Sequence, residues 1–405
     1  MTRSMTSPAR PLRVLFAHCR YQERGGEDVV LENEMALLAA NGHEVDLFCL
    51  SNDSIRSTWD KMRTALGATY DRGARRQLGE RVARFRPDIL HVHNFFPLLS
   101  PSVYDAAAEA GVPVVQTLHN FRITCANPDL TRGLSSCDLC VTGNAYLWAT
   151  RYRCYRHSFL GSLAVAHMIE THRSRHTWTR KIGHIICLSD YMRAVFMRYG
   201  IPPSHLSVVR NFCFDAFGTA PAAPPEGPPS ALFVGRLTQN KGVEMLIEAW
   251  QDMPYRLDIA GTGPLASRIA AAAPPNVRLL GFLDAAALRQ AYRAAALLVV
   301  PSLRTEGGPL SLIEAMSAGL PVVISDWPPH GEFVEDEQTG RIWRGRTATG
   351  LHQLLRGLLD APEMLWRMGV KGRETFERRF APERHYEQLI DIYTGLGVRE
   401  RAGGG

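Results

Sequence analysis

The sequence predicts an α/β protein with two Rossmann-like doubly wound domains. Its 405 residues suffice for two domains with separate cores. In both halves, short apolar runs alternate with amphipathic stretches, the pattern of strand, helix and strand in a parallel sheet. A stretch rich in Pro, Ala and Gly, 217–230, has no periodicity and separates the halves. We therefore expect a first domain at 1–212, a linker at 213–230 and a second domain at 231–379.

The first half contains the apolar runs of a sheet and two long amphipathic segments. We expect helices at about Val29 to Asn41 and from Ser158 to Trp178. The expected strands are Leu12 to Ala17, Glu44 to Leu50, Arg86 to Asn94, Val112 to Asn120 and Ile182 to Leu188. Val208 to Asn211 is expected to close the first domain. Parallel sheets carry their chemistry at the carboxyl ends of strands, so polar residues at those ends are the first candidates.

The second half repeats the pattern with shorter elements. A helix is expected to end near Trp250, another at Leu310 to Ala318, and a last one at Pro382 to Tyr393. The expected strands are Ala231 to Val234, Arg256 to Ala260, Val277 to Leu280, Ala295 to Val300 and Pro321 to Ser325.

Charge and cysteine content narrow the classes of function. The net charge is +6, with +8 on residues 1–212 and −2 on 213–405. The arginines are scattered and form no recognition helix, which argues against nucleic acid. An anionic membrane surface or a phosphate-bearing acceptor fits this charge at least as well, and solvated helix faces account for most of the arginines. No signal-peptide core and no membrane-spanning apolar run is present, so a cytosolic location is expected. Eight cysteines do not make a disulfide scaffold in a chain of this size.

The stretch Pro301 to Pro321 has the features of a binding site. Its loop, Glu306-Gly307-Gly308, follows an apolar strand and precedes a helix, and Pro309 suits the first helical position. Free backbone N–H groups at a helix start bind phosphate oxygens. The stretch therefore predicts a site for a phosphorylated ligand.

Two glutamates in this stretch identify the ligand further. Glu306 and Glu314 lie eight residues apart in E-G-G-P-L-x-x-x-E-A-M-x-x-G-x-P-V-V. This pattern resembles the donor-site motif of the retaining nucleotide-sugar glycosyltransferases of family 4. The resemblance implies that Glu306 binds a donor-sugar hydroxyl, that Glu314 binds the ribose, and that the backbone around Gly307, Gly308, Pro309 and Leu310 faces the diphosphate.

A second loop carries the positive charge that a diphosphate needs. In Gly235 to Gly242 an arginine, Arg236, and a lysine, Lys241, follow a strand and precede a helix. G-R-L-x-x-x-K-G is similar to the second signature of the same family. The resemblance also implies that Gly281 and Phe282 hold the nucleotide base through backbone groups. A dinucleotide site at Gly261-Thr262-Gly263 is less favoured, because the third glycine and the acidic partner are missing.

Three features of the first half belong to the same comparison. The loop Arg24-Gly25-Gly26-Glu27 resembles the glycine-rich loop of family 4, where Gly26 would face the donor. His119 ends a strand in T-L-H-N, which resembles the strand end whose histidine contacts the transferring sugar. His91 alternates with apolar residues and is expected to be a satisfied, half-buried imidazole.

Four cysteines form C-x11-C-x2-C-x13-C: Cys125, Cys137, Cys140 and Cys154. Tetrahedral zinc sites commonly use close C-x2-C pairs, and here one pair is close. The pattern resembles an insertion at about 121–160 in a subset of family 4, which continues in R-C-Y-R as here. A structural zinc ion and four reduced thiols are both open interpretations. The remaining cysteines, Cys19, Cys49, Cys187 and Cys213, are expected to be small core residues.

The resemblance covers residues 12 to 393 and implies the GT-B fold, with two domains facing a cleft and a C-terminal helix at 380–396 returning to the first. It implies a retaining transferase that uses a UDP- or GDP-sugar and needs no metal for transfer. The expected acceptor is a lipid-linked glycan in bacterial surface polysaccharide synthesis at the inner membrane. Pro328-Pro329-His330-Gly331-Glu332 departs from the family pattern. The alternatives are a glycosidase, which has no use for the Arg236 and Lys241 loop, and a non-catalytic nucleotide-sugar-binding scaffold.

Overall fold

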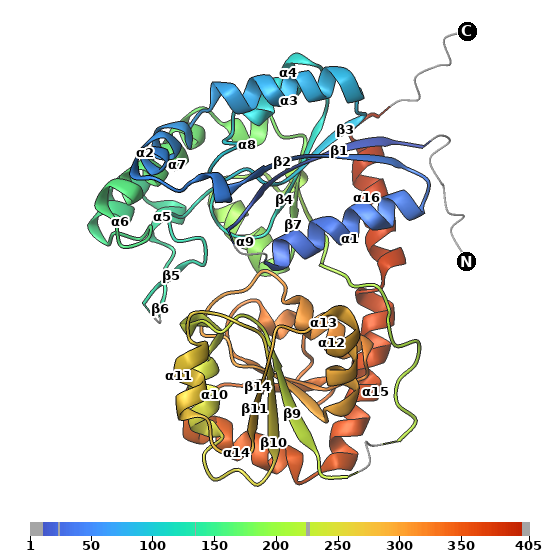
Figure 1. The fold of residues 1–405 in the computed structure, drawn as a ribbon. Coiled ribbons are helices and arrows are strands. Elements are labelled where there is room, and N and C mark those ends of the chain that lie inside the picture. The colour runs from blue at the N-terminus through green and yellow to red at the C-terminus, as the bar shows by residue number, and fades with distance from the viewer. Residues whose placement is uncertain (1–10, 23–24, 134, 224–226, 399–405) are drawn as a thin grey trace. The chain divides into compact units, whose positions relative to one another are not determined.

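The computed structural model describes residues 11–22, 25–133, 135–223 and 227–398. The N-terminal residues 1–10, Arg24 of the glycine-rich loop and residues 224–226 of the expected linker lie outside the described residues. The chain divides into two compact units. The first comprises residues 1–209 together with 385–405, and the second comprises residues 210–384. Each unit contains one six-stranded parallel sheet with helices packed on it, as expected for Rossmann-like domains (Figure 1).

The sheet of the first unit has the strand order β2-β1-β3-β4-β7-β8. The order reverses between β1 and β3, the position where open α/β sheets bind ligands. The strands are β1 (Arg13–Arg20), β2 (Glu44–Ser51), β3 (Ile89–Asn94), β4 (Val114–Leu118), β7 (His184–Cys187) and β8 (Leu206–Val208). The five predicted strands are present with boundaries shifted by a few residues, and β8 was not predicted as a strand.

The helices described in the first unit outnumber the two that the sequence predicted. They are α1 (Gly26–Ala40), α2 (Thr58–Gly67), α3 (Arg72–Phe85), α4 (Val103–Glu109), α7 (Phe159–Ser174), α8 (Thr177–Arg180) and α9 (Asp190–Arg198), with 3-10 turns η1 (Asn52–Ser54) and η2 (Pro203–His205). The single helix predicted from Ser158 to Trp178 is wrong. His176 has a left-handed backbone with φ of 53°, which ends α7 and starts the short α8.

The segment between β4 and α7 forms a small insertion. It contains the two-residue strands β5 (Thr131–Arg132) and β6 (Ser135–Ser136), paired antiparallel, then α5 (Leu139–Thr142) and α6 (Ala145–Arg151). It packs on α7 and α9 through α6 and α5.

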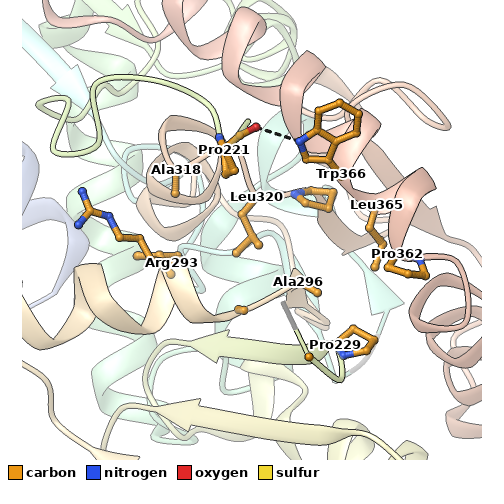
Figure 2. A pocket seen from close by; sticks show the side chains of 14 residues that line it. Pro221, Pro229, Arg293, Ala296, Ala318, Leu320, Pro362, Leu365 and Trp366 are labelled. Carbon is orange, nitrogen blue, oxygen red and sulfur yellow. Dashed lines mark hydrogen bonds between the residues drawn. The ribbon is translucent and has the colours of Figure 1, made fainter. Parts of the chain in front are cut away.

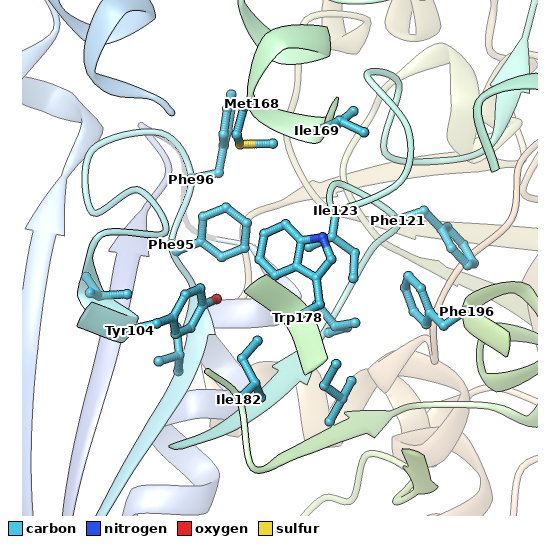
Figure 3. Packing of buried hydrophobic residues seen from close by; sticks show 14 of the residues in the cluster. Phe95, Phe96, Tyr104, Phe121, Ile123, Met168, Ile169, Trp178, Ile182 and Phe196 are labelled. Carbon is cyan, nitrogen blue, oxygen red and sulfur yellow. The ribbon is translucent and has the colours of Figure 1, made fainter. Parts of the chain in front are cut away.

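Trp178 is at the centre of the main core of the first unit, as Figure 3 shows. Its indole stacks on Phe95 with ring centroids 5.8 Å apart and meets Tyr104 edge to face at 6.1 Å. Buried aromatic pairs of this kind are favourable beyond the area that they remove from water. The break at His176 therefore still leaves α8 anchored, because Trp178 is buried in this cluster.

The sheet of the second unit has the order β11-β10-β9-β12-β13-β14, and the order reverses between β9 and β12. The strands are β9 (Ser230–Val234), β10 (Arg256–Ala260), β11 (Val277–Gly281), β12 (Leu297–Val300), β13 (Val322–Ser325) and β14 (Gly340–Trp343). The first five match the predicted strands, and β14 was not predicted.

The helices of the second unit are α10 (Val243–Ala249), α11 (Ala266–Ala272), α12 (Ala285–Ala294), α13 (Leu310–Ser317), α14 (Ala348–Leu359) and α15 (Pro362–Arg379). Two 3-10 turns, η3 (Gln239–Lys241) and η4 (His330–Glu332), lie beside the predicted donor loops. Pro309 is the N-cap residue of α13, one position before the expected one. The last helix, α16 (Pro382–Gly395), carries the chain back to the first unit at His385.

The expected linker is packed onto the second unit over its described part. Asp215 binds Arg373 of α15, with Oδ1 2.9 Å from Nη1. The Trp366 indole N–H donates to the Pro221 carbonyl at 2.9 Å, beside a cavity of about 80 Å³ (Figure 2). Residues that line this cavity precede β9, β12 and β13, namely Pro229, Ala296 and Pro321. The cavity therefore lies at the amino ends of the strands, away from the edge where ligands bind.

Candidate active site

The loops that follow β9, β10 and β12 meet at the carboxyl edge of the second sheet. The Leu237 N–H donates to the Thr262 carbonyl at 2.8 Å, and the Leu303 N–H donates to the Asn240 carbonyl at 2.8 Å. These bonds join loops on both sides of the strand reversal. The two predicted phosphate loops, Gly235 to Gly242 and Glu306 to Pro309, are thereby placed at the point that favours ligand binding.

Two glycines allow the loops to come this close. Gly242 has φ of +71°, and a Cβ there would lie 2.0 Å from the Pro301 carbonyl oxygen. At Gly261, with φ of +147°, a Cβ would lie 1.9 Å from the Gly235 oxygen. No other residue fits either backbone. These two glycines allow the loops to contact each other through their backbones. The sequence pattern alone did not predict this contact.

Lys241 and Glu306 bind each other across this meeting point. The ammonium nitrogen of Lys241 lies 2.8 Å from both carboxylate oxygens of Glu306. Ser302 donates a further hydrogen bond to the same carboxylate. Burial by itself would raise the pKa of Glu306, but Lys241, Arg304 and His330 more than offset it and lower the pKa to about 2. Glu306 is therefore an anion at neutral pH that only accepts hydrogen bonds.

Buried polar atoms without a hydrogen-bond partner gather around this ion pair. Within the described residues, these include Thr305 Oγ1, His330 Nε2 and Asn211 Oδ1. The Asn211 amide donates to the Gly308 carbonyl at 2.8 Å, and His330 Nδ1 lies 2.9 Å from the Ser325 carbonyl. The bond to a carbonyl places the proton of His330 on Nδ1 and leaves Nε2 as an acceptor. Buried groups left unsatisfied in this way are typical of a ligand site.

The other predicted donor residues are placed around the same edge. The half-buried Glu314 of α13 accepts a hydrogen bond from the Tyr292 hydroxyl at 2.7 Å, and burial raises its pKa. At Gly308 a Cβ would lie 3.3 Å from the Asn211 amide. Arg236 is exposed, and so is Phe282, at 77%. The half-buried Gly281 ends β11, and its carbonyl accepts from the Gly261 N–H at 2.7 Å.

In the first unit, His119 is the end of a buried chain of hydrogen bonds. Its Nε2 lies 2.9 Å from His93 Nδ1, and His93 Nε2 lies 3.1 Å from Glu34 Oε2. The other oxygen of Glu34 lies 3.1 Å from His385 Nε2 of α16. Burial would raise the pKa of Glu34, but His93 and His385 outweigh it and hold the pKa well below its ordinary value. The carboxylate is therefore charged and only accepts.

His119 has one ring nitrogen that is free for a ligand. Burial and the neighbouring His93 lower the pKa of His119 well below its ordinary value, so its ring is neutral and has one donor nitrogen and one acceptor nitrogen. Its Nε2 is used in the bond to His93. Within the described residues, no hydrogen bond reaches its Nδ1.

His91 is satisfied, as predicted, although it is fully buried rather than half-buried. Its Nδ1 lies 2.7 Å from the Tyr393 hydroxyl and its Nε2 lies 2.8 Å from Thr117 Oγ1. Donor atoms of Glu34, His91 and His93 lie within 4.8 Å of one another, the one group of three with metal-like spacing in the described part of the chain. Each of the three already has a hydrogen-bond partner inside the protein. The group is therefore complete as a hydrogen-bonded network.

The glycine-rich loop of the first unit is held to the ends of β1 and β4. The Gly25 N–H donates to Asp28 at 2.8 Å, and Asp28 pairs with the buried His18 of β1 at 3.0 Å. The Asn120 amide donates to Glu27 at 2.9 Å. Gly26 is exposed at the start of α1, where its N–H groups are unobstructed by a side chain. His119 and this loop thus share one edge of the first sheet.

The four cysteines of the insertion approach one another. Cys125 and Cys140 are buried and Cys137 and Cys154 are half-buried, and all four are free thiols. A hydrogen bond between the thiols raises the pKa of Cys125 well above its ordinary value and lowers that of Cys140. Burial, with Cys140 and Cys137 as neighbours, raises the pKa of Cys154 to about 11. Four thiols are the donor set that zinc prefers, although no three of their sulfur atoms, all in the described residues, come within 4.8 Å.

Sequence reasoning missed Glu34, His93, His385 and His330. Glu34, His93 and His385 contact residues far away in the sequence, since Glu34 and His385 are 351 positions apart. His330 is buried and bonds to Ser325 at the end of β13. The remaining core cysteines follow the prediction, since Cys19, Cys187 and Cys213 are buried, whereas Cys49 is half-buried. The sequence did offer one signal for Glu34, because it is a charged residue on the apolar side of a helix.

Family models match both halves of the chain. Residues 24–213 match the model of Glycosyltransferase Family 4, and residues 219–375 match that of Glycosyl transferases group 1. An uncharacterized glycosyltransferase of Methanocaldococcus jannaschii is 29% identical over 41% of this chain and 48% of its own length. A putative colanic acid biosynthesis glycosyltransferase of Escherichia coli is 28% identical over 52% of this chain and 56% of its own length. The aligned part thus spans about half the length of these relatives.

A solved structure with the same fold covers nearly the whole chain. The crystal structure of Anabaena HepE in complex with UDP-glucose has a TM-score of 0.66 and 16% identity, covering 95% of this chain and 100% of HepE. At this identity the similarity shows the fold, which is GT-B. The helices in the described residues are all too short or too polar to cross a bilayer.

We predict that Gly242→Ala disrupts the second unit. The added Cβ would overlap the Pro301 carbonyl at a backbone conformation that alanine resists, so the free energy of unfolding should fall by about 2 kcal/mol or more. Gly357→Ala is the matched control, because its Cβ would enter open space in α14 and should stabilise slightly. Urea unfolding of both variants measures this, and equal stability would contradict the close approach.

We predict that the first unit loses stability as the pH falls from 6.5. Burial lowers the pKa of His91 to about 3 and of His172 to about 4, from ordinary values of 6.5. Between these limits the unfolded chain binds more protons, so each histidine should reduce stability by about 1.4 kcal/mol per pH unit. Glu34, whose pKa is also lowered, adds a loss at still lower pH. Urea midpoints at a series of pH values measure the slope.

The controls for this slope are two histidine variants. His157 is exposed, so His157→Gln should leave the pH slope unchanged. His172→Gln removes one of the buried imidazoles whose pKa is lowered and should flatten the slope between pH 4 and 6.5. A slope that is unchanged in His172→Gln shows that this imidazole is protonated in the folded chain.

Proposed function

The chain belongs to the glycosyltransferases of family 4 and group 1, and from this premise we propose that it transfers a sugar, with retention, from a nucleoside diphosphate sugar to an acceptor hydroxyl. The observation that carries the proposal is the Lys241–Glu306 pair at the strand reversal of the second unit. It joins a cation suited to phosphate and an anion suited to sugar hydroxyls at one point. The buried unsatisfied atoms of Thr305, His330 and Asn211 supply further polar contacts for a donor.

In the proposed complex, Lys241 serves the phosphate and Glu306 at the same time. An ammonium group has three N–H donors, and the two oxygens of Glu306 engage two of them. The third is available to a phosphate oxygen. Arg236 and the N–H groups of Gly307, Gly308 and Leu310 at the start of α13 add positive potential where the diphosphate leaves.

Glu306 and Glu314 have different proposed tasks because their environments differ. The low pKa of Glu306 keeps it ionised, so it accepts hydrogen bonds from a sugar hydroxyl and donates no proton. Glu314 lies on α13 beside Tyr292, and we assign it to the ribose hydroxyls. Gly281 ends β11 and Phe282 follows it, and both would hold the base through their backbone.

The proposed reaction needs no protein base. The acceptor oxygen attacks the anomeric carbon from the face that the diphosphate leaves. The bond to phosphate breaks, and the departing phosphate takes the acceptor's proton. Retention follows from attack on the same face. His119, whose Nε2 is bonded to His93, would bind a hydroxyl of the transferring sugar through Nδ1, and Gly26 would approach the donor from the loop before α1.

The proposed donor is a UDP- or GDP-sugar and the proposed acceptor is a lipid-linked glycan of a bacterial surface polysaccharide. The structure of HepE contains UDP-glucose, which supports a nucleotide sugar for this fold. The Escherichia coli relative is named for colanic acid biosynthesis, which supports a polysaccharide acceptor. Such an acceptor would bring a cytoplasmic enzyme to the inner face of the membrane.

We predict that Glu306→Gln and Lys241→Ala each lower kcat about 100-fold or more. The first removes the anion that accepts from the sugar, and the second removes charge from the leaving diphosphate. Transfer assays with a panel of nucleotide sugars and lipid-linked acceptors measure this, and the anomeric configuration of the product tests retention.

Glu363→Gln is the matched control for these variants. Glu363 is exposed on α15 and lies 3.4 Å from Arg367, away from the carboxyl edge of the sheet, so this variant should transfer at the wild-type rate. Near-wild-type rates in both Glu306→Gln and Lys241→Ala would overturn the mechanism. Tight donor binding without any transfer by the wild type would instead support the scaffold alternative.

We also propose that Cys125, Cys137, Cys140 and Cys154 hold one structural zinc ion. The group would fix the insertion to α7 and α9 and supplies no step of the transfer reaction. The support is the four-thiol donor set and the contact between Cys125 and Cys140. The alternative is four reduced thiols, as the wider spacing of the sulfur atoms permits.

We predict one zinc ion per chain in freshly purified, reduced protein. Metal analysis by mass spectrometry should find it, and Cys140→Ser should lose it together with several degrees of thermal stability. Cys49→Ser is the matched control, because Cys49 is half-buried in β2 and lies outside the insertion. Protein free of zinc, with all four thiols reactive, would contradict the proposal.

A further inference from the structure

Three helical segments of the first unit expose an unusual amount of apolar surface. Nine of the fourteen exposed large apolar side chains in the described part of the chain fall in residues 55–67 and 145–163. They are Trp59, Met62 and Leu66 on α2, Tyr146 and Leu147 on α6, Tyr152 after it, and Phe159, Leu160 and Leu163 on α7. Soluble proteins rarely gather apolar side chains in this way without a partner.

The apolar residues of α2 form a helical stripe that faces solvent. Trp59, Met62 and Leu66 have spacings of three and four residues, so they share one face of the helix. An amphipathic helix normally turns such a face toward the core, yet no residue of α2 is buried. Trp59 is 68% exposed and Leu66 is 78% exposed. The stripe of α2 is therefore an unpartnered face.

The three segments lie together on one unit. α2 packs on α7, and α6 packs on α7, as Figure 1 shows at one end of the first unit. The Tyr146 hydroxyl lies 2.7 Å from His167 Nδ1, which ties α6 to α7. We call residues 55–67 and 145–163 together the apolar-basic face.

The charge of the apolar-basic face is strongly positive. It contains six lysines and arginines and one acid, and the six cations are all exposed. They are Arg56, Lys61, Arg63, Arg151, Arg153 and Arg156. The one acid, Asp60, accepts hydrogen bonds from the N–H and hydroxyl of Ser57 at 2.8 Å in the cap of α2. The start of α2 thus partly neutralises the charge of Asp60, and the six cations determine the sign of the electrostatic potential at this face.

We propose that the apolar-basic face docks the protein on an anionic lipid bilayer. Apolar and aromatic side chains surrounded by arginine and lysine are the combination that inserts into the headgroup region of an anionic membrane. Trp and Tyr favour that interface, since one part of each ring is apolar and another is polar. A globular protein partner would need matching acidic residues in a fixed array, whereas a fluid anionic surface matches scattered cations. This inference rests on the proposed function only for the purpose of docking, which is to bring the protein to a lipid-linked acceptor.

The test uses the full chain and vesicles that contain no acceptor, so it is independent of transfer. Flotation with phosphatidylcholine vesicles, with and without phosphatidylglycerol, measures binding at low and high salt. We expect binding to the anionic vesicles that weakens in high salt, and little binding to neutral ones. Arg153→Gln with Arg156→Gln should weaken binding about fivefold per arginine. Trp59→Ser with Leu160→Ser should weaken it about tenfold or more, because their insertion is lost.

Exposed residues elsewhere provide the matched controls. Met364→Ser removes an exposed apolar side chain from α15, and Arg378→Gln removes an exposed cation from the same helix. Both variants should bind vesicles as the wild type does. All the changed side chains are exposed, so thermal unfolding should show that every variant is folded.

A spectroscopic readout locates the surface that touches lipid. Brominated lipids quench the fluorescence of nearby indoles. They should therefore quench the wild-type emission, and this quenching should be smaller in Trp59→Phe. Quenching that is unchanged in Trp59→Phe, or equal binding by the face variants and the controls, overturns the proposal. Self-association of the wild type that the face variants abolish, without vesicle binding, would show that the face joins two copies of the chain and also overturns it. Activity lost with vesicle binding intact would instead implicate the proposed function.

Discussion

The second unit depends on one buried ion pair, Lys241 with Glu306. A carboxylate enclosed in protein is stable only when a cation and hydrogen-bond donors replace the water that it has lost. Lys241 follows β9 and Glu306 follows β12, the two strands between which the order of the sheet reverses. The pair therefore joins the two halves of the sheet at their loops, and the Gly242 approach to Pro301 makes this contact sterically feasible. The same geometry leaves the third N–H of the Lys241 ammonium without a partner in Glu306. The bond that stabilises the fold therefore also positions a donor for a phosphate oxygen.

The first unit applies the same physical rule at Glu34. Its carboxylate is surrounded by imidazoles from β3 and from the C-terminal helix, and it fixes them as donors. Removing one partner would leave a buried charge uncompensated, which costs far more than an exposed ion pair contributes. The return of the chain to the first unit at His385 is therefore tied electrostatically to the ring of His119, two hydrogen bonds away from Glu34. A residue near the end of the sequence thus helps to orient one in the first sheet.

The sequence predicted what depends on local spacing and missed what depends on distant pairs. Strands and the helix after Gly308 were recovered because apolar periodicity, Pro309 and Gly319 act over a few residues. The break at His176 was missed because a left-handed residue that is not glycine leaves no mark in the pattern. Glu34 lies on the apolar side of its helix, which marks it in the sequence, but only the folded chain brings His93 and His385 to it. His330 was hidden for the same reason, since its orphaned Nε2 becomes visible only with the loops in place.

The apolar-basic face raises a question that stability cannot answer. An apolar stripe on α2 gains nothing for the fold while it stays in water, and exposed cations close together repel one another. Both features become favourable when the face contacts an anionic lipid bilayer, which is apolar inside and negatively charged at its surface. The polar loops at the strand ends have the opposite deficit, since their buried atoms lack polar partners. The chain therefore shows two incomplete surfaces of different chemistry, one suited to a lipid boundary and one suited to a charged sugar nucleotide. A transferase that joins a water-soluble donor to a membrane-bound acceptor needs both.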